Sequence, residues 1–329
     1  MTLMKQFLGA AATLALTAGA GLAEPALIFD LGGKFDKSFN EAAYVGAERW
    51  KTETGGTYKE LELQSEAQRE QALRRLAQQG SNPIVMTGFA IADVLNTVAP
   101  DYPETQFVII DMVVDQPNVQ SVVFTEEQGS YLVGVMAAKA SETGTVGFIG
   151  GMDVPLIRKF ACGYVQGVKA ANPDAKIVQN MTGSTPSAWN DPVKGAELTR
   201  AQIAQGADVV YAAAGGTGIG VLQTAADENI LSIGVDSNQN FMHPGKVLTS
   251  MTKRVDNAVF DAFSAEAGVS SGVKVMDLAS GGVDYAMDDN NAPLVSEEMK
   301  AAVDAAAEGI KSGAIKVHDY QTDSTCPVE

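Results

Sequence analysis

The chain has little of what most metal and redox sites require. Its 329 residues include only two histidines and two cysteines, too few for most zinc sites or for an iron–sulfur cluster. Basic residues are also scarce, with 23 Lys+Arg against 40 Asp+Glu and a formal net charge of −17. Phosphate groups and anionic lipids bind clustered Lys and Arg, so this composition argues against nucleic acid and against a charged membrane surface as partners.

What is present is enough apolar material for a large core. Hydrophobic residues make up 46% of the chain and charged residues only 19%. Such a composition is typical of globular proteins rather than of disordered ones. A length of 329 residues suggests about two domains, at roughly 150 residues each.

The first 23 residues have the pattern of a secretory signal peptide. Lys5 supplies positive charge, residues 7–22 form an uncharged Ala-rich run, and Gly21 and Ala23 occupy the small-residue positions before Glu24. The run is short and small-residue-rich for a membrane span. We therefore expect cleavage after Ala23 and a periplasmic location. No cysteine lies near this point, so we expect no lipid anchor.

Export changes how the two cysteines are interpreted. Cys162 falls in a predicted helix and Cys326 in the C-terminal tail. An oxidising compartment permits a disulfide between them, but two separate thiols fit the sequence equally well. A catalytic cysteine is disfavoured, because neither histidine has an obvious route to either thiol.

Short apolar runs alternate with longer amphipathic ones, which is the pattern of parallel sheets flanked by helices. Two such cycles of similar size predict two doubly wound α/β lobes. The predicted strands cover residues 26–29, 83–86, 107–110, 119–124, 145–149, 175–180, 208–213, 230–235 and 247–251. The predicted helices cover residues 38–53, 68–79, 129–140, 156–171, 194–205, 219–228, 256–267 and 296–311.

An aspartate directly follows three of the predicted strands. Asp30, Asp111 and Asp236 stand at these ends, and the glycine-rich loop 215–218 follows another strand. Any one aspartate could cap the next helix. Ligands of open α/β sheets, however, bind outside the carboxyl ends of the strands. Together these residues predict a shared polar cleft for a neutral ligand with many hydrogen-bond donors, such as a nucleoside or a sugar.

Two aromatic residues are predicted near the same edge. Phe39 and Trp189 could stack on a flat base, as aromatic rings do with nucleobases elsewhere. The alternatives are that Phe39 packs in a helix core and that Trp189 anchors a surface loop.

The sequence supports an enzyme less well than it supports a binding cleft. Gly216-Thr217-Gly218 opens a predicted helix with Asp236 about 20 residues on, which resembles a dinucleotide-binding loop, but Val221 stands where the third glycine belongs. Neither His243 nor His318 has a catalytic motif around it. A secreted NAD-dependent enzyme remains the rival from another class.

Several motifs occur in an order that resembles the basic membrane protein family of ABC-transporter substrate-binding proteins, which includes purine-nucleoside receptors. The most specific is Asp-Leu-Gly-Gly-Lys-Phe-Asp-Lys-Ser-Phe-Asn at residues 30–40. Further motifs lie at residues 43–46, 107–111, 144–152, 214–218, 233–239 and 248–253. Together they run through most of the chain after residue 23.

The resemblance implies a type I periplasmic binding protein fold, with two lobes joined by a three-strand hinge that closes on the ligand. It implies a purine nucleoside or nucleobase ligand, an ABC permease as partner, a monomer, and no reaction. Some relatives bind other flat ligands, including a flavin, so a flavin or a sugar stays open. We expect residues 24–124 plus 247–275 to form the N-terminal lobe, and residues 125–246 plus 276–329 the C-terminal lobe.

By motif position, the resemblance also implies the ligand-binding residues. An aromatic from each lobe would sandwich the base, and Asp and Lys side chains would hold its edge and the ribose. The expected ligand-binding residues are Asp30, Lys37, Ser38, Phe39, Asn40, Asp111, Trp189, Gly215, Gly216, Asp236 and Lys253. For Asp236 and Lys253, a structural ion pair at the hinge is the alternative to ligand binding.

Overall fold

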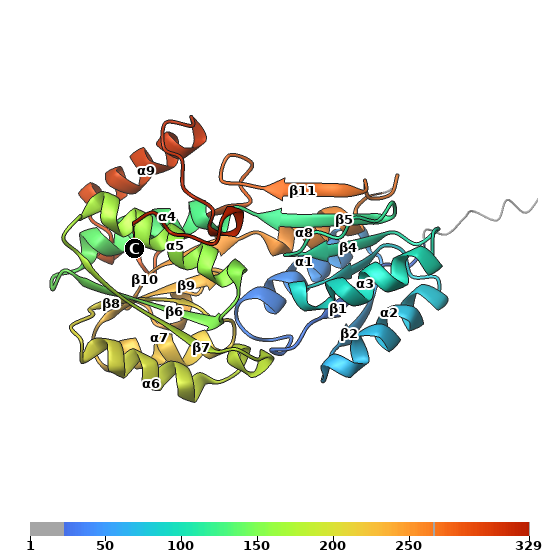
Figure 1. Cartoon of the computed structure of the whole chain (residues 1–329), viewed down its shortest axis with the longest axis horizontal. Helices are drawn as coiled ribbons and strands as arrows, with labels where there is room; N and C mark the ends of the chain where they lie inside the picture. The colour runs from blue at the N-terminus through green and yellow to red at the C-terminus, as the bar shows by residue number, and fades with distance from the viewer. Residues whose placement is uncertain (1–22, 266, 329) are drawn as a thin grey trace, which may run out of the picture.

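Two α/β lobes lie side by side in the computed structural model, which describes residues 23–328 apart from residue 266 (Figure 1). The N-terminal lobe has a six-stranded sheet in the order β11-β5-β4-β3-β1-β2, and the C-terminal lobe has one in the order β12-β10-β9-β8-β6-β7. All pairings are parallel except that of β12 with β10. The expected two-lobed fold is confirmed. The predicted signal peptide, up to residue 22, lies outside the described residues.

The elements follow the alternation expected from the sequence. The N-terminal lobe contains β1 (Ala26–Phe29), α1 (Phe39–Thr54), β2 (Lys59–Glu62), α2 (Arg69–Gln78), β3 (Ile84–Met86), α3 (Ala92–Val98), β4 (Phe107–Ile110), β5 (Val119–Phe124), α8 (Val255–Phe263) and β11 (Gly272–Met276). The C-terminal lobe contains α4 (Glu126–Ala140), β6 (Thr145–Met152), α5 (Pro155–Ala171), β7 (Lys176–Gly183), α6 (Pro192–Ile203), β8 (Val209–Ala213), α7 (Thr217–Asp227), β9 (Leu231–Asp236), β10 (Val247–Lys253), β12 (Val283–Tyr285) and α9 (Glu297–Lys311).

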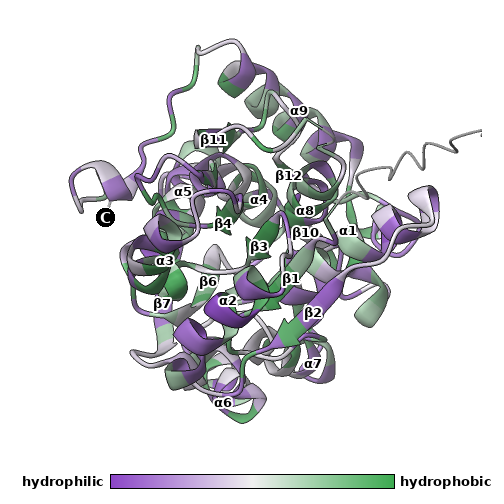
Figure 2. Cartoon of the chain, turned by 90° about the vertical axis from the view of Figure 1, so that its right-hand side faces the viewer, coloured by the Kyte–Doolittle hydropathy of each residue, from purple (hydrophilic) through white to green (hydrophobic). Residues whose placement is uncertain are grey.

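The central strands of the N-terminal lobe are apolar on both faces, because helices cover both. Leu27 and Phe29 of β1 pack in the core cluster on the α1 and α8 side, while Ala26 and Ile28 pack in a second cluster with α2 and α3. Side chains of a strand alternate between its two faces, so a continuous apolar run fills both layers. Seen from this end of the molecule, the hydrophobic strand β1 lies behind the hydrophilic outer face of α2 (Figure 2).

In the C-terminal lobe, α4 and α5 pack closely against each other. Two glycines one turn apart on α5 make this possible, since a Cβ atom at Gly163 would lie 2.4 Å from the carbonyl oxygen of Glu127, and one at Gly167 would lie 2.0 Å from that of Tyr131. The contact holds the first turn of α4 firmly against α5, and that turn forms part of the hinge.

Three segments cross between the lobes: β5 to α4, β10 to α8, and β11 to β12. The expected lobe boundary at residue 247 is wrong, because β10 pairs with β9 in the C-terminal sheet from Val247 to Thr252. The chain returns to the N-terminal lobe only after Lys253. Lys253 therefore lies at the end of a hinge strand rather than within the N-terminal lobe.

Four elements escaped prediction. The strands β2, β11 and β12 lie at the edges of their sheets, and α3 has only seven residues. The residues of β2 read Lys-Glu-Leu-Glu and those of β11 are largely exposed, so neither has the apolar run used to find the central strands.

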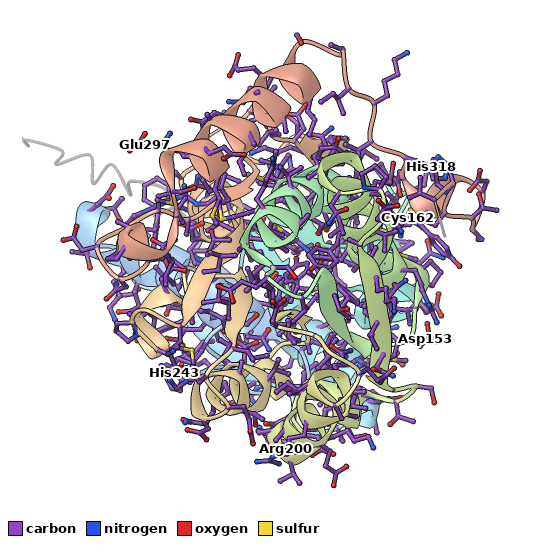
Figure 3. All side chains as sticks on the ribbon, turned by 90° about the vertical axis from the view of Figure 1, so that its left-hand side faces the viewer. Asp153, Cys162, Arg200, His243, Glu297 and His318 are labelled. Atoms are coloured by element: carbon purple, nitrogen blue, oxygen red, sulfur yellow. A yellow bond between two sulfur atoms is a disulfide. The ribbon has the colours of Figure 1, made fainter. Side chains whose placement is uncertain are left out.

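A disulfide joins Cys162 on α5 to Cys326 in the tail, which decides the alternative that the sequence left open. Two more contacts hold the tail on the same face of α5. The His318 backbone exchanges hydrogen bonds of 2.8 and 3.0 Å with the side-chain amide of Gln166. The Asp319 carboxylate lies 3.5 Å from the Lys159 ammonium. Cys162 and His318 lie close together at this side of the molecule (Figure 3).

The double substitution Cys162→Ser with Cys326→Ser should lower the free energy of unfolding by about 2–5 kcal/mol, because the disulfide closes a long loop in the unfolded chain. Chemical denaturation measures the difference. Reductant should bring the natural protein to the level of the double variant and leave the variant unchanged. Equal stability of the two proteins without reductant would contradict this role.

Candidate functional site

A cavity lies between the lobes at the carboxyl ends of their strands. Its volume is about 650 Å³, counted with the solvent space at its mouth. Asp30 follows β1, Asp111 follows β4, and Asp236 and Lys253 are the last residues of β9 and β10. The lining residues are Asp30, Leu31, Gly32, Asp36, Phe39, Asn40, Gly88, Phe89, Asp111, Leu156, Ile157, Phe160, Trp189, Ala213, Gly215, Val235, Asp236 and Lys253.

Eight of the eleven residues expected from the sequence line this cavity, and Lys37, Ser38 and Gly216 do not. The Lys37 ammonium forms an ion pair of 3.0 Å with Glu41. The fully buried Ser38 hydroxyl donates to the Asp236 carboxylate. Gly216 packs against the main chain of Trp189, because a Cβ atom at Gly216 would lie 3.2 Å from the Trp189 carbonyl oxygen. Lys37 and Ser38 belong to the loop that frames the cavity.

The backbone turns sharply at two of the strand-end aspartates. Asp111 has φ +76° and Asp236 has φ +63°, both in the left-handed region that residues other than glycine rarely adopt. Such a conformation costs on the order of 1–3 kcal/mol and is retained where the surrounding structure holds it, often at binding sites. Here it brings both carboxylates to the cavity.

Two expected ligand-binding residues already have protein partners. The Asn40 side-chain amide donates to the carbonyl oxygens of Asp30 and Gly33 at 3.2 Å each, and its oxygen accepts from Thr87 at 2.8 Å. One oxygen of the Asp30 carboxylate accepts a charged hydrogen bond of 3.1 Å from the buried Arg69. Asn40 therefore shapes the loop after β1, and Arg69 balances the charge of Asp30.

The ammonium of Lys253 is the buried centre of the site. It lies 2.7 Å from Asp111 and 2.9 Å from Glu126, and its side chain is 1% exposed. Burial alone would lower the pKa of Lys253, but the surrounding carboxylates, led by Asp111 and Glu126, raise it above its ordinary value. Burial raises the pKa of Asp111 to about 6, against the opposite effect of Lys253. The second oxygen of the Asp111 carboxylate, Oδ1, is buried without a hydrogen-bond partner in the described structure.

A line of alternating charges continues from Lys253 into the C-terminal lobe. Glu126 also lies 3.0 Å from Lys159, which contacts Glu127 at 3.3 Å and Asp319 of the tail at 3.5 Å. Lys159 further donates a 2.7 Å hydrogen bond to the carbonyl oxygen of Phe124, at the end of β5. Burial would raise the pKa of Glu126, but Lys253 and Lys159 hold it below its ordinary value. These ion pairs, which we call the buried ion-pair network, include residues at two of the three hinge crossings.

The structure does not form the ion pair between Asp236 and Lys253 that was the alternative to ligand binding. The ion pairs of Lys253 are with Asp111 and Glu126, while Asp236 accepts from the Ser38 hydroxyl. Burial raises the pKa of Asp236, and Lys253 partly offsets the rise. The two residues interact through their charges rather than as a bonded pair.

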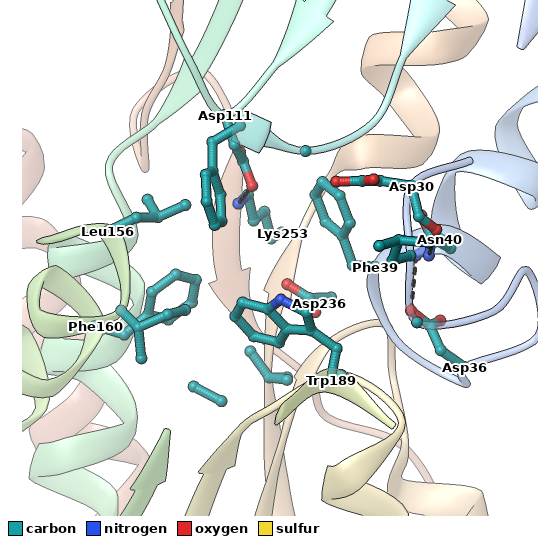
Figure 4. A pocket seen from close by; sticks show the side chains of 18 residues that line it. Asp30, Asp36, Phe39, Asn40, Asp111, Leu156, Phe160, Trp189, Asp236 and Lys253 are labelled. Atoms are coloured by element: carbon teal, nitrogen blue, oxygen red, sulfur yellow. Dashed lines mark hydrogen bonds and ion pairs between the residues drawn. The ribbon is translucent and has the colours of Figure 1, made fainter. Parts of the chain in front are cut away.

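The remaining wall of the cavity is apolar. Phe39 and Trp189 border the cavity as expected, and α5 adds Leu156, Ile157 and Phe160 on another side (Figure 4). The Trp189 ring needs Gly151, because a Cβ atom there would lie 2.2 Å from it. Sequence reasoning missed the α5 residues. The only available signal was their place in the first turns of the helix after β6, where an amphipathic pattern also predicts ordinary core packing.

The glycine-rich loop after β8 does not leave the N-terminus of α7 free. The Thr217 hydroxyl donates to the Ala188 carbonyl oxygen at 2.8 Å and accepts from the Asp191 N–H at 2.7 Å. Thr217 is fully buried. Since residues 188–191 pack on this turn, the helix end that would bind a pyrophosphate is covered.

The fold and the interlobe cavity are those of two-lobed solute-binding proteins. Among the described residues, the helices are too short or too polar to cross a membrane. Residues 24–321 match the family model described as "ABC transporter substrate-binding protein PnrA-like". The chain therefore belongs to this family of ABC-transporter substrate-binding proteins, and the resemblance drawn from the sequence motifs is confirmed.

Individual relatives agree with this assignment. The ABC transporter nucleoside-binding protein BmpA of Lactococcus lactis is 34% identical over 319 residues, covering 89% of this chain and 88% of the relative. Basic membrane protein A of Borreliella afzelii is 34% identical over 251 residues, covering 73% and 74%. A solute-binding protein of Aeropyrum pernix superposes with a TM-score of 0.83 at 27% identity, covering 92% of this chain and 95% of that one.

Replacing Lys159 by Met should cost about 3–5 kcal/mol of unfolding free energy, because Glu126 and Glu127 would be buried without their shared cation. The loss should be smaller at pH 5 than at pH 8, since burial raises the pKa of Glu127 to about 7 and the neutral acid needs no cation. Chemical denaturation at both pH values tests this.

Lys139→Met is the matched control, because Lys139 pairs with Glu298 at 3.2 Å on the surface. Such a pair contributes about 0–1 kcal/mol. A Lys159 variant as stable as this control would show that the buried ion-pair network does not stabilise the fold.

Proposed function

We propose that this substrate-binding protein is a periplasmic receptor that captures purine nucleosides or nucleobases between its lobes. It delivers them to the permease of an ABC importer and carries out no reaction. The proposal includes cleavage of the export segment after Ala23 and a chain without a lipid anchor, acting as a monomer. Relatives include proteins named as lipoproteins, such as one of Pyrococcus abyssi at 33% identity over 278 residues, so the absence of an anchor would distinguish this chain from them.

The unpartnered oxygen of Asp111 is the observation that carries the proposal. A buried acceptor without a partner costs about 1–3 kcal/mol or more when it is charged, and a ligand N–H or O–H would remove that cost. Asp236 adds a second carboxylate beside it. The Watson–Crick edge of a purine and the hydroxyls of a ribose supply donors of this kind.

The charge of the lining favours a neutral ligand. Asp30, Asp36, Asp111 and Asp236 line the cavity, and Lys253 is the one cation among its described lining residues. Lys253 already lies between Asp111 and Glu126, so it has little attraction left for a phosphate or a carboxylate. A nucleoside fits this balance better than a nucleotide does.

The shape of the apolar wall favours a flat ligand. Phe39 comes from the N-terminal lobe and Trp189 from the C-terminal lobe, and both line the same cavity (Figure 4). Stacking of a base on an aromatic side chain contributes about 1–3 kcal/mol. The Lactococcus lactis relative is named for nucleoside binding, which supports the same ligand class. A flavin or a sugar is the alternative, and the covered N-terminus of α7 disfavours a dinucleotide.

A thermal-shift panel of inosine, guanosine, adenosine, riboflavin, glucose and NAD should show stabilisation by at least one purine nucleoside. A ligand at 100 times its dissociation constant adds about 2.7 kcal/mol to the stability of the folded state. Guanosine monophosphate is the matched control for charge and should give a smaller shift than guanosine. Stabilisation by glucose, riboflavin or NAD alone would refute the purine proposal.

Replacing Asp111 by Asn should weaken binding of the nucleoside about 10- to 150-fold, the equivalent of one hydrogen bond to a charged group. In the natural protein, affinity should fall as the pH drops through about 6, because the protonated Asp111 is a poorer acceptor. By pH 5 the loss should be about tenfold. Calorimetric titration from pH 8 to pH 5 measures both effects.

Part of any pH dependence will come from Asp36, whose pKa burial raises to about 7. The Asp111→Asn variant isolates the contribution of Asp111, because only that part should disappear. Asp261→Asn removes an equal charge from a surface pair with Lys274 and should leave affinity unchanged. An Asp111 variant with the affinity and pH profile of this control would exclude Asp111 as a ligand acceptor.

A further inference from the structure

Hydrogen bonds join the two lobes directly beside the cavity. Lys37 and Ser38, in the loop after β1 of the N-terminal lobe, present their main-chain carbonyl oxygens to the loop after β9 of the C-terminal lobe. The Gln239 side-chain amide donates to the Lys37 carbonyl at 2.9 Å, and the Ser237 hydroxyl donates to the Ser38 carbonyl at 2.9 Å. We call these two bonds the cross-lobe latch. Neither Ser237 nor Gln239 lines the cavity.

The donor side of the latch is held rigidly within the C-terminal lobe. The Gln239 side-chain oxygen accepts the Val235 N–H at 2.9 Å, and the Gln239 N–H donates to the Ser250 hydroxyl at 2.9 Å. Gly234 leaves room for this arrangement, since a Cβ atom there would lie 2.6 Å from the Gln239 oxygen. Gln239 is 1% exposed. Its amide N–H groups are therefore aimed at the other lobe without further loss of side-chain entropy on closure.

The acceptor side is held equally firmly within the N-terminal lobe. The Asp36 carboxylate accepts the main-chain N–H groups of Ser38, Asn40 and Glu41 at 2.8–3.1 Å, which anchors the loop to the start of α1. Lys37 has φ +60°, a left-handed conformation that turns the chain at this point. The two carbonyl groups thus belong to a loop whose position is set by its own lobe.

We propose that Ser237 and Gln239 are positioning residues that stabilise the closed form and thereby raise ligand affinity without contacting the ligand. This rests on the proposed function, capture of a ligand between the lobes. The two loops belong to different lobes, so separation of the lobes breaks both bonds. Each bond then shifts the equilibrium between open and closed forms by roughly 2- to 10-fold. Because the ligand binds the closed form, its apparent affinity rises with the closed fraction.

The test uses two variants with inosine as the probe. Ser237→Ala removes one latch bond and should weaken affinity roughly 2- to 10-fold, mostly through faster dissociation. Gln239→Glu keeps the oxygen that accepts the Val235 N–H but sets a carboxylate oxygen against the Lys37 carbonyl, so its effect should be larger. Ser312→Ala is the matched control, because the Ser312 hydroxyl donates to the Gly309 carbonyl at 3.2 Å at the end of a single helix. It should match the natural protein.

Small-angle X-ray scattering of the ligand-free proteins provides a second readout that a local structural role would not change. Ser237→Ala and Gln239→Glu should have larger radii of gyration than Ser312→Ala, while Ser237→Ala keeps the thermal stability of Ser312→Ala within the error of surface substitutions. If Gln239→Glu does not fold, Ser237→Ala decides the matter. If inosine binds, affinities of Ser237→Ala and Ser312→Ala that agree overturn the latch.

The two proposals can fail separately. If the natural protein binds none of the purines of the panel, the proposed ligand class is wrong. Scattering then decides the latch alone, because an unchanged radius of gyration in Ser237→Ala would overturn it without any ligand.

Discussion

The buried ammonium of Lys253 is the interaction on which the site and the hinge both depend. It ends β10, at the point where the chain leaves the C-terminal sheet, and lies 2.7 Å from Asp111 of the N-terminal lobe and 2.9 Å from Glu126. Removing water from these groups is expensive, and their mutual attraction offsets the cost only while the three stay together. The same contact therefore joins the lobes, compensates the charge of Asp111 in the cavity and connects the cavity to the buried ion-pair network.

The balance of charges explains how an acidic protein can keep several carboxylates in one cavity. Arg69 forms an ion pair with Asp30, main-chain N–H groups donate hydrogen bonds to Asp36, and Lys253 forms an ion pair with Asp111. One oxygen of Asp111 is left without a partner. The protein thus provides an incompletely satisfied acceptor in a cavity whose other wall is apolar, and this combination supports the proposed flat ligand with donors at its edge.

In the two proposals, ligand capture and lobe closure depend on different residues. The cavity lining carries the proposed ligand contacts, whereas Ser237 and Gln239 bind main-chain carbonyls outside it. Relatives with the same ligand contacts could therefore differ in affinity through the latch alone. Under these two proposals, the cavity specifies which ligand binds and the latch adjusts how tightly the ligand is held.

Sequence alone determined the class of fold, because central parallel strands must be apolar on both faces and helices must alternate with them. It also located Asp30, Asp111 and Asp236, since strand ends are visible as the point where an apolar run stops. Edge strands such as β2 and β11 stayed hidden, because half-exposed strands lack that run. Phe160 stayed hidden too, because an apolar residue facing a cavity and one facing a core obey the same helical period. The partners of each buried group were decided only in the tertiary structure. Lys253 forms ion pairs with Asp111 and Glu126 rather than with Asp236, and Cys162 forms a disulfide with Cys326. These contacts join segments more than a hundred residues apart, so they depend on how the lobes pack and where the chain crosses between them.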